Sequence, residues 1–300
     1  MRVPASTSNL GAGFDCVGVA VDRWLTASVQ VDEKSSAVTI SRSGAVAKLS
    51  RKAEEDLIHT GFRLACEACS KAVPRGLAYE VSSTIPVARG LGASAAALVA
   101  GAFLAKGALD LDLTPQAIAS LCARDEGHPD NAAPSVFGGA VLGIPVNDGE
   151  SYAFAELAIH SRLTLVFAVP QLEILTSEAR RVLPKSVPHA IAVKAAAKSA
   201  ALIEGLSSGD EALLAFALDD VLHVPFRRHL LQGYDSIVSA ATNAGAFGAT
   251  LSGSGSTMVA VAPRENATHV GEAMQSTWRT RGQTVEVIIS DKIVDGASLG

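Results

Sequence analysis

The chain has 300 residues, of which 48% are hydrophobic and 5% aromatic, so a core built mainly from Ala, Val and Leu is expected. Its 25 basic and 30 acidic residues give a formal charge of −5, and no basic run stands out, which argues against nucleic acid as a partner. The longest nearly apolar stretch, residues 93–105, is too short to span a bilayer, and no apolar signal segment follows Met1. A cytoplasmic protein with no membrane partner is therefore expected.

The chain opens with a polar, glycine-containing stretch that predicts a loop. Pro, Ser, Thr and Asn, followed by two glycines, are typical of a loop and not of the interior of a strand or helix. Asn9 and Asp15 lie six residues apart around this turn. From these residues alone the pair is either part of a site or an Asx turn with a helix cap.

Residues 25–31 and 37–41 next predict the two strands of a hairpin, and residues 54–72 an amphipathic helix with acids in its first turn. Cys66 and Cys69 form a C-x-x-C pair within this helix, but no second cysteine pair follows. We interpret both as small buried residues and not as a redox or zinc site.

A glycine-bearing loop then joins a predicted strand, residues 77–85, to a predicted helix, residues 94–109. Gly90 and Gly92 allow the backbone to approach a ligand, and the N–H groups at a helix N-terminus attract anions. The Ser94 hydroxyl could reach a phosphate oxygen or its metal. Taken alone, the loop could also be a tight turn without a ligand. It is neither a Walker A loop nor a dinucleotide fingerprint, because Ala95 replaces the third glycine of the latter.

The first half of the chain is predicted to end with a helix, a polar cluster and a strand. Thr114 caps the helix, which has Pro115 at its first position and runs to about residue 124. The polar cluster occupies residues 126–131, and residues 136–144 predict the strand. The acidic segment at residues 147–151 is the best candidate boundary, so domains at residues 1–150 and 151–300 are expected.

In the second half, strands and helices alternate in the order β-α-β-β-α-β once extra helices are set aside. A serine- and glycine-rich loop, residues 252–256, joins the two middle strands. Strands are predicted at residues 163–169, 247–251, 257–262 and 284–289, and helices at 177–183, 190–206, 211–221, 235–245 and 267–281. This order predicts an antiparallel sheet with helices on one face.

The glycine-bearing loop resembles the phosphate loop of the GHMP kinases, P-x-x-x-G-L-G-S-S-A-A, from which it departs only at Ala93. Four further stretches resemble the homoserine kinase branch of that superfamily: S-N-L-G-A-G-F-D at 8–15, G-H-P-D-N at 127–131, T-S-E-A-R at 176–180 and L-S-G-S-G at 251–255. Together they span almost the whole chain. The resemblance implies an α+β two-domain GHMP kinase fold, with an N-terminal domain like ribosomal protein S5 domain 2 and a ferredoxin-like C-terminal domain.

The resemblance also implies an activity, ATP-dependent phosphorylation of the side-chain hydroxyl of L-homoserine on the way to threonine, with ATP and Mg²⁺ as cofactors. The nucleotide would be bound by Pro86, Val87, Ala88, Arg89, Gly90, Leu91, Gly92, Ala93, Ser94, Ala95, Ala96, Ser252, Gly253, Ser254 and Gly255. The amino acid would be bound by Asn9, Asp15, His128, Asp130, Asn131, Thr176, Arg180 and Arg227. Catalysis would involve Asp130, Asn131, Ser94 and Arg180. A homodimer is left open.

The chemistry of these residue types agrees with their implied roles. Asp15 can take the substrate ammonium, while Arg180 and Arg227 can hold the carboxylate with paired N–H donors. Ser94 and an acid would hold the metal; Glu126 is the first choice and Asp125 the alternative, because the residues before His128 depart from the family pattern. Whether Asp130 acts as a base is open.

Two other functions are weighed against this one. A kinase for another small alcohol, such as mevalonate or shikimate, is disfavoured because mevalonate has no ammonium for Asp15. A GHMP-fold sensor that binds ligand without turnover is disfavoured because Ser94, Asp130 and both arginines are present, and a binder has no need of the metal-contacting Ser94.

Overall fold

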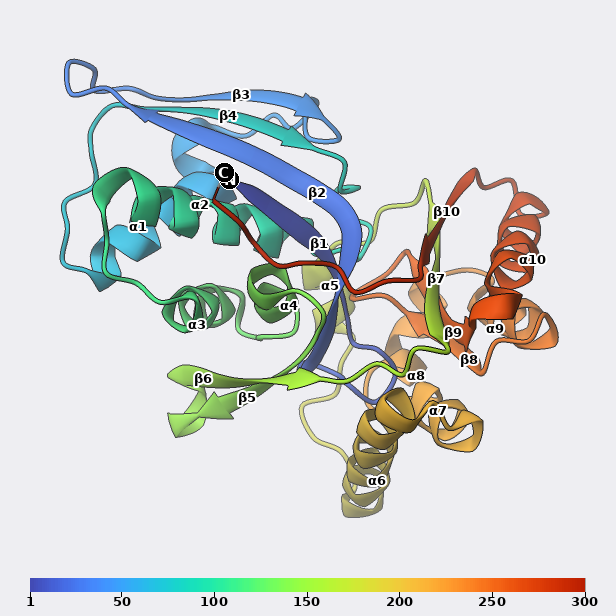
Figure 1. Ribbon diagram of the computed structural model, residues 1–300. Coiled ribbons are helices and arrows are strands. Elements are labelled where there is room, and N and C mark those ends of the chain that lie inside the picture. The colour runs from blue at the N-terminus through green and yellow to red at the C-terminus, as the bar shows by residue number, and fades with distance from the viewer. Residues whose placement is uncertain (300) are drawn as a thin grey trace.

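Two sheets, one in each half of the chain, organise the computed structural model, which describes residues 1–299 (Figure 1). The first sheet has the order β3-β4-β2-β5-β6, with β1 paired to β2, and the second has the order β10-β7-β9-β8. The strands of the first sheet are β1 (Arg2–Ser8), β2 (Val17–Val31), β3 (Val38–Gly44), β4 (Leu77–Ser83), β5 (Ala140–Val146) and β6 (Ser151–Leu157).

The predicted N-terminal loop is wrong for residues 2–8, which form the buried strand β1. Val3 and Ala5 belong to the core, and Ser6 donates a hydrogen bond to Asn131 Oδ1 at 3.1 Å. The polar residues of this segment are therefore satisfied by side chains of the interior, not by water. The loop that follows is correspondingly shorter and covers residues 9–16.

The predicted hairpin is also wrong, although both of its strands exist. β4 lies between β2 and β3; it pairs antiparallel with β2 and parallel with β3. A parallel pair needs a long crossover, and the helix α1 (Leu57–Ala68) provides it. α1 begins later and ends earlier than predicted, because a 3-10 turn at Ala53–Glu55 precedes it and Asp56 caps its first turn.

The core of the first half is the helix α2 (Ala93–Leu109), buried between the sheet and α1. A Cβ at Gly61 of α1 would lie 2.0 Å from Leu98 O, and one at Gly101 would lie 1.9 Å from Ile58 O. Glycine at both positions lets the two helix backbones touch. The predicted helix 94–109 agrees with this packing, and so does the predicted burial of Cys66; Cys69 is only half-buried, and both are free thiols.

One further helix leads to the polar cluster at residues 126–131, and another follows it. α3 (Pro115–Glu126) is capped as predicted by Thr114, whose side chain accepts a hydrogen bond from Ala117 N. The predicted strand 136–144 is wrong in its first part, because the helix α4 (Ala132–Phe137) occupies it. Gly138 and Gly139 then turn the chain at φ of +77° and +56°, so β5 starts only at residue 140.

The segment 147–151 forms the turn between β5 and β6, which pair antiparallel along their whole length. β6 therefore belongs to the first sheet, and the division expected at residue 150 falls inside this hairpin. The chain passes to the second sheet over residues 158–162. We infer that the change of domain lies there.

The second half has the predicted β-α-β-β-α-β order, and all three strand pairs are antiparallel. α9 and α10 pack on one face of the sheet around their own core, while the other face joins the core of the first half. The elements are β7 (Leu163–Pro170), α5 (Thr176–Arg181), α6 (His189–Ser208), α7 (Glu211–Leu218), α8 (Val224–Arg227), α9 (Tyr234–Asn243), β8 (Gly248–Leu251), β9 (Met258–Pro263), α10 (Ala267–Arg279) and β10 (Val285–Ser290).

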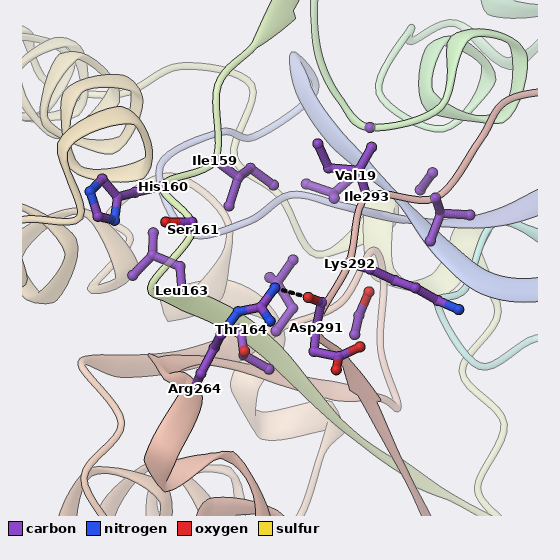
Figure 2. A pocket seen from close by; sticks show the side chains of 15 residues that line it. Val19, Ile159, His160, Ser161, Leu163, Thr164, Arg264, Asp291, Lys292 and Ile293 are labelled. Atoms are coloured by element: carbon purple, nitrogen blue, oxygen red, sulfur yellow. Dashed lines mark hydrogen bonds between the residues drawn. The ribbon is translucent and has the colours of Figure 1, made fainter.

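After β10 the chain returns to the first half, and the two ends of the chain lie together (Figure 1). Arg2 and Ser298 exchange backbone hydrogen bonds of 2.8 and 2.9 Å. A cavity of about 190 Å³ lies under this returning segment, between β2, residues 159–161 and β7. Figure 2 shows Arg264 on its polar side, where the guanidinium donates to the carbonyl of Asp291.

None of the helices described for residues 1–299 combines the length and apolar character needed to cross a membrane.

Candidate active site

The phosphate-type loop connects β4 to α2 and is built around two glycines with positive φ. Gly90 and Gly92 have φ of +74° and +67°, in the region that other residues rarely adopt. A Cβ at Gly90 would lie 2.1 Å from Ser252 O, and one at Gly92 would lie 2.1 Å from Ser6 Oγ. Both positions therefore require glycine for conformation and for space.

The loop ends at the N-terminus of α2, where the helix can receive an anion. The first α-helical backbone bond runs from Ala96 N to Gly92 O at 3.0 Å, so the N–H groups of residues 93–95 point out of the helix start. Ser94 is exposed in this first turn. Beside it lies a cavity of about 100 Å³ with mainly apolar walls, to which Leu25, Val46, Leu49, Val87 and Ser94 contribute.

The second glycine-rich loop, residues 252–255, packs directly against the first and is buried. Ser252 Oγ donates to Gly90 O at 2.6 Å, and Gly253 N donates to Ser8 O at 2.8 Å. Asn9 adds a third tie, because its Nδ2 donates to Gly253 O at 3.0 Å while its Oδ1 accepts from Asp15 N at 3.0 Å. The side chain of Asn9 thus connects the loop 252–255 to the loop of residues 9–16.

Asp15 and Arg180 form a paired salt bridge across the two halves of the chain. Arg180 lies on α5, and its two terminal nitrogens contact the two carboxylate oxygens of Asp15 at 2.8 and 3.2 Å. About one third of each side chain is exposed to solvent. The residues expected to hold opposite ends of an amino acid are therefore paired with each other.

Arg227, the last residue of α8, is 2% exposed, and its Nη1 has no hydrogen-bond partner among the described residues. Its Nε donates to the carbonyl of Ala179, beside Arg180, at 3.0 Å. Burial lowers the pKa of Arg227 to about 10, although Asp15 raises it. Figure 1 shows α5 and α8 where the two halves meet. The site therefore contains a buried cation whose terminal donor is free to bind an anion.

His128 and Asp130 lie at the start of the turn into α4 and are hydrogen-bonded, with 2.5 Å between Nδ1 and Oδ1. Burial disfavours the charged imidazole, but the hydrogen bond to Asp130 and the charges of Asp130 and Glu126 together outweigh it and raise the pKa of His128. Asp130 is fully buried, and within residues 1–299 its Oδ2 has no hydrogen-bond donor. Together with Asp15, these side chains offer three ligand atoms within 4.8 Å of one another, which suits a cation or an ammonium group.

Asn131 links this group to the phosphate-type loop. Its Nδ2 donates to Ser8 Oγ at 3.0 Å, and its Oδ1 accepts from Ser6 Oγ at 3.1 Å. A Cβ on Gly92 would lie 3.1 Å from that same Oδ1. Asn131 therefore lies between the anion-binding loop and Asp130. Ser6 and Ser8 were missed from the sequence; their only signal is the row of small hydroxyl residues ahead of Asn9.

Glu126 ends α3 close to the same group. Burial raises its pKa to about 7, with neighbouring Asp130 and Asp125 adding to the rise and His128 opposing it. Its Oε2 is buried, and no residue described in the structure donates to it. Asp125 is exposed. The structure thus brings Glu126 to the site, although Glu126 lies outside the three-residue group above.

Thr176 is exposed at the start of α5, with its Oγ1 3.5 Å from Ser254 Oγ. The contacts given above thus connect the loops at residues 9–16, 86–92 and 252–255 with Asn131 and with the start of α5.

Comparison with known proteins gives consistent results over both halves of the chain. The family models "GHMP kinases N terminal domain" and "GHMP kinases C terminal" match residues 56–139 and 202–280. The homoserine kinase of Gloeobacter violaceus is 39% identical over 93% of this chain and 92% of its own, and that of Nostoc sp. is 37% identical over 96% and 94%. The crystal structure of homoserine kinase from Cytophaga hutchinsonii superposes with a TM-score of 0.85 at 27% identity, covering 98% of this chain and 95% of its own.

Proposed function

Because the chain belongs to the homoserine kinase family of the GHMP kinases, we propose that it transfers the γ-phosphoryl group of ATP to the side-chain hydroxyl of L-homoserine. The product, O-phospho-L-homoserine, lies on the route to threonine. The two-domain GHMP kinase fold and the agreement along the whole chain support this activity.

One observation in the site supports this substrate most directly: two buried polar groups, of opposite kind, lack partners among the described residues. Arg227 Nη1 has no acceptor and Asp130 Oδ2 has no donor. Leaving such groups unsatisfied costs about 1–3 kcal/mol each, more when they are charged. Homoserine carries a carboxylate for Arg227 and a hydroxyl for Asp130, so binding would satisfy both.

The third polar group of homoserine, its ammonium, would bind where Asp15 now contacts Arg180. We expect substrate to enter by exchange: the ammonium replaces Arg180 on Asp15, and the carboxylate replaces Asp15 on Arg180. Each exchange conserves a charge-assisted contact, so a ligand that has both groups does not strip either side chain of its partner. A ligand with only one of these groups leaves Asp15 or Arg180 unpaired.

ATP would bind with its phosphates against residues 86–96 and its base in the neighbouring apolar cavity. The N–H groups that begin α2 and the positive-φ glycines suit the phosphates, and the walls near Leu25, Val46 and Val87 suit a flat apolar ring. The loop 252–255 would shape this site from the other side, since Ser252 is bonded to Gly90.

A magnesium ion would be held by Ser94 and Glu126, both oxygen donors of the kind that Mg²⁺ prefers. The donor-free Oε2 of Glu126 among the described residues supports this assignment, because a cation there would offset the burial that raises the pKa of Glu126 to about 7. When bound, the ion neutralises charge on the phosphates.

The chain's own residues would then position the hydroxyl for attack. Asp130 Oδ2 accepts the hydroxyl proton as a hydrogen bond, and the His128 contact fixes the carboxylate through its other oxygen. Asn131, held by Ser6 and Ser8, separates the acceptor from the phosphate loop. Phosphoryl transfer depends on positioning and charge stabilisation more than on covalent help, which this arrangement supplies.

A coupled assay of ADP release tests the proposal with four conditions: L-homoserine, mevalonate, shikimate and no acceptor. Of the four conditions, we expect ADP release above background only with L-homoserine. Equal or faster release with mevalonate or shikimate would assign the chain to another alcohol. Binding of homoserine without ADP release would favour a sensor.

A further inference from the structure

The ring of Phe14 contacts both His223 and Arg227 beside the part of the site that is proposed to bind the substrate carboxylate. The rings of His223 and Phe14 lie 4.9 Å apart with their planes at 19°, and the guanidinium carbon of Arg227 lies 5.1 Å from the centre of the Phe14 ring. Phe14 directly precedes Asp15 in the chain. The ring that contacts both side chains thus belongs to the loop that carries the proposed ammonium ligand.

Hydrogen bonds hold His223 and the start of α8 in place. His223 is fully buried, and its Nε2 lies 3.3 Å from the carbonyl of Gly11, which requires the proton on Nε2. Asp220 accepts hydrogen bonds from the backbone of Leu222, His223 and Val224 at 3.0, 2.6 and 2.8 Å, which fixes the start of α8.

The charges around Phe14 favour the contact between its ring and the Arg227 cation. Burial lowers the pKa of His223, so the imidazole is neutral and adds no second cation. The face of the Phe14 ring carries partial negative charge, which attracts a guanidinium within about 6 Å of its centre. The Phe14 ring thus lies beside a cation that is 2% exposed.

The contacts of Arg227 leave its Nη1 available to bind a ligand. Its Nε donates to Ala179 O at 3.0 Å, and its guanidinium carbon lies over the Phe14 ring, 5.1 Å from the ring centre. Its Nη1 is the atom that finds no acceptor within the described part of the chain. The hydrogen bond to Ala179 and the Phe14 ring therefore restrict the guanidinium from two sides, and Nη1 remains available to a ligand.

We propose that Phe14 is a positioning residue for recognition of the substrate carboxylate: supported by His223, its ring holds the Arg227 guanidinium in the orientation that binds the carboxylate, at a fixed distance from Asp15. This inference rests on the proposed function, because it takes the carboxylate of homoserine as the ligand of Arg227. It gives a role to the Phe of the N-L-G-A-G-F-D stretch, which the proposed reaction does not otherwise use.

The test compares Phe14→Leu, which keeps apolar volume but loses the ring face, with Phe14→Tyr, which keeps the ring. Binding is measured by titration calorimetry with L-homoserine and with homoserinol, which has the ammonium and hydroxyl but no carboxylate. Phe14→Leu should weaken homoserine binding by about 5- to 30-fold, the range of a partly desolvated cation–π contact. Homoserinol binding and the KM for ATP should stay within about twofold, since neither uses Arg227. Phe14→Tyr should resemble the parent.

Phe154→Leu is the matched control, because it also removes a half-buried aromatic pair, with Phe137 at 5.3 Å, but on the edge strand β6. It should leave both affinities unchanged. Equal losses for homoserine and homoserinol in Phe14→Leu, or a loss in Phe14→Tyr as large as in Phe14→Leu, would overturn the positioning role. Turnover of homoserine by the parent is scored separately, so a failure of the proposed reaction is not confused with a failure of this inference.

Discussion

Replacing Arg227 by Met should stabilise the substrate-free protein while removing its affinity for homoserine. Arg227 is 2% exposed, and no described residue accepts from its Nη1. Met has a similar length and no charge, so it fills the same space without the cost of burying a cation. A residue that serves binding at the expense of stability should behave in this way.

The magnitude follows from the pKa of Arg227, which burial lowers from its ordinary value to about 10. At about 1.4 kcal/mol for each tenfold change in acidity, the buried charge costs about 3 kcal/mol. The variant also loses the hydrogen bond to Ala179 O, worth about 1 kcal/mol, and the contact with the Phe14 ring, worth about 1 kcal/mol. The net expectation is a gain of about 1 kcal/mol, or a rise in Tm of about 2–4 °C.

Thermal unfolding at pH 7 with and without homoserine measures both effects. At a concentration of about 100 times Kd, homoserine should stabilise the parent by about 2.7 kcal/mol and the variant not at all. Arg180→Met is the control: Arg180 is about one third exposed and paired with Asp15, so its loss should change stability by only about 0–1 kcal/mol. A destabilisation of Arg227→Met by more than about 1 kcal/mol would show that the cation is already compensated in the substrate-free site, contrary to this reasoning.

Three further predictions concern the reaction and its pH dependence. Ser94→Ala should fold normally, because Ser94 is exposed in a first helical turn, but should lower kcat by about 10-fold or more; unchanged kcat at saturating Mg²⁺ would remove Ser94 from the site. Asp130→Asn should lower kcat by about 10²-fold with little change in homoserine binding if Asp130 is the base, and a loss within about threefold would exclude that role. For Glu126, the pKa of about 7 in the folded chain is above its ordinary 4.5, so its protonated form stabilises the fold at low pH and this stability is lost as pH rises through about 7. With a chelator present, Glu126→Gln should therefore lose less Tm than the parent between about pH 5 and 8, and identical pH profiles would contradict the raised pKa.

The elements of the C-terminal half could be predicted well because their local sequence patterns agree with the structure that they form. Its strands are short apolar runs between turn residues, and α7 is capped by Asp210, so the order of strands and helices along the chain and the antiparallel pairing agree with the sequence.

The predictions for the first half fail where the local sequence pattern and long-range contacts favour different structures. Ser6, Thr7 and Ser8 suggest a loop, yet they form a buried strand because Asn131 and Ser252 satisfy their hydroxyls from distant parts of the chain. The pairing of β4 between β2 and β3 is likewise a long-range choice that local propensity does not determine.

The site could be predicted as a set of residues but not as a set of contacts. The motifs indicated Asp15, Arg180 and Arg227, and the structure brings all three to the junction of the two halves. That Asp15 and Arg180 pair with each other, and that Phe14 and His223 stack beside Arg227, depends on how α5 and α8 dock against the first-half loop. Neither arrangement has a signal in the spacing of the residues.

The central claim is that the site recognises both charged ends of an amino acid through exchange with the Asp15–Arg180 pair. The most direct measurement is kcat/KM for four acceptors: homoserine, homoserinol without the carboxylate, 4-hydroxybutyrate without the ammonium, and 1,4-butanediol without either. Homoserinol and 4-hydroxybutyrate should each lose at least about tenfold, and butanediol should lose less than the product of the two losses, because Asp15 and Arg180 then keep each other. Strictly multiplicative losses, or 4-hydroxybutyrate matching homoserine, would contradict the exchange.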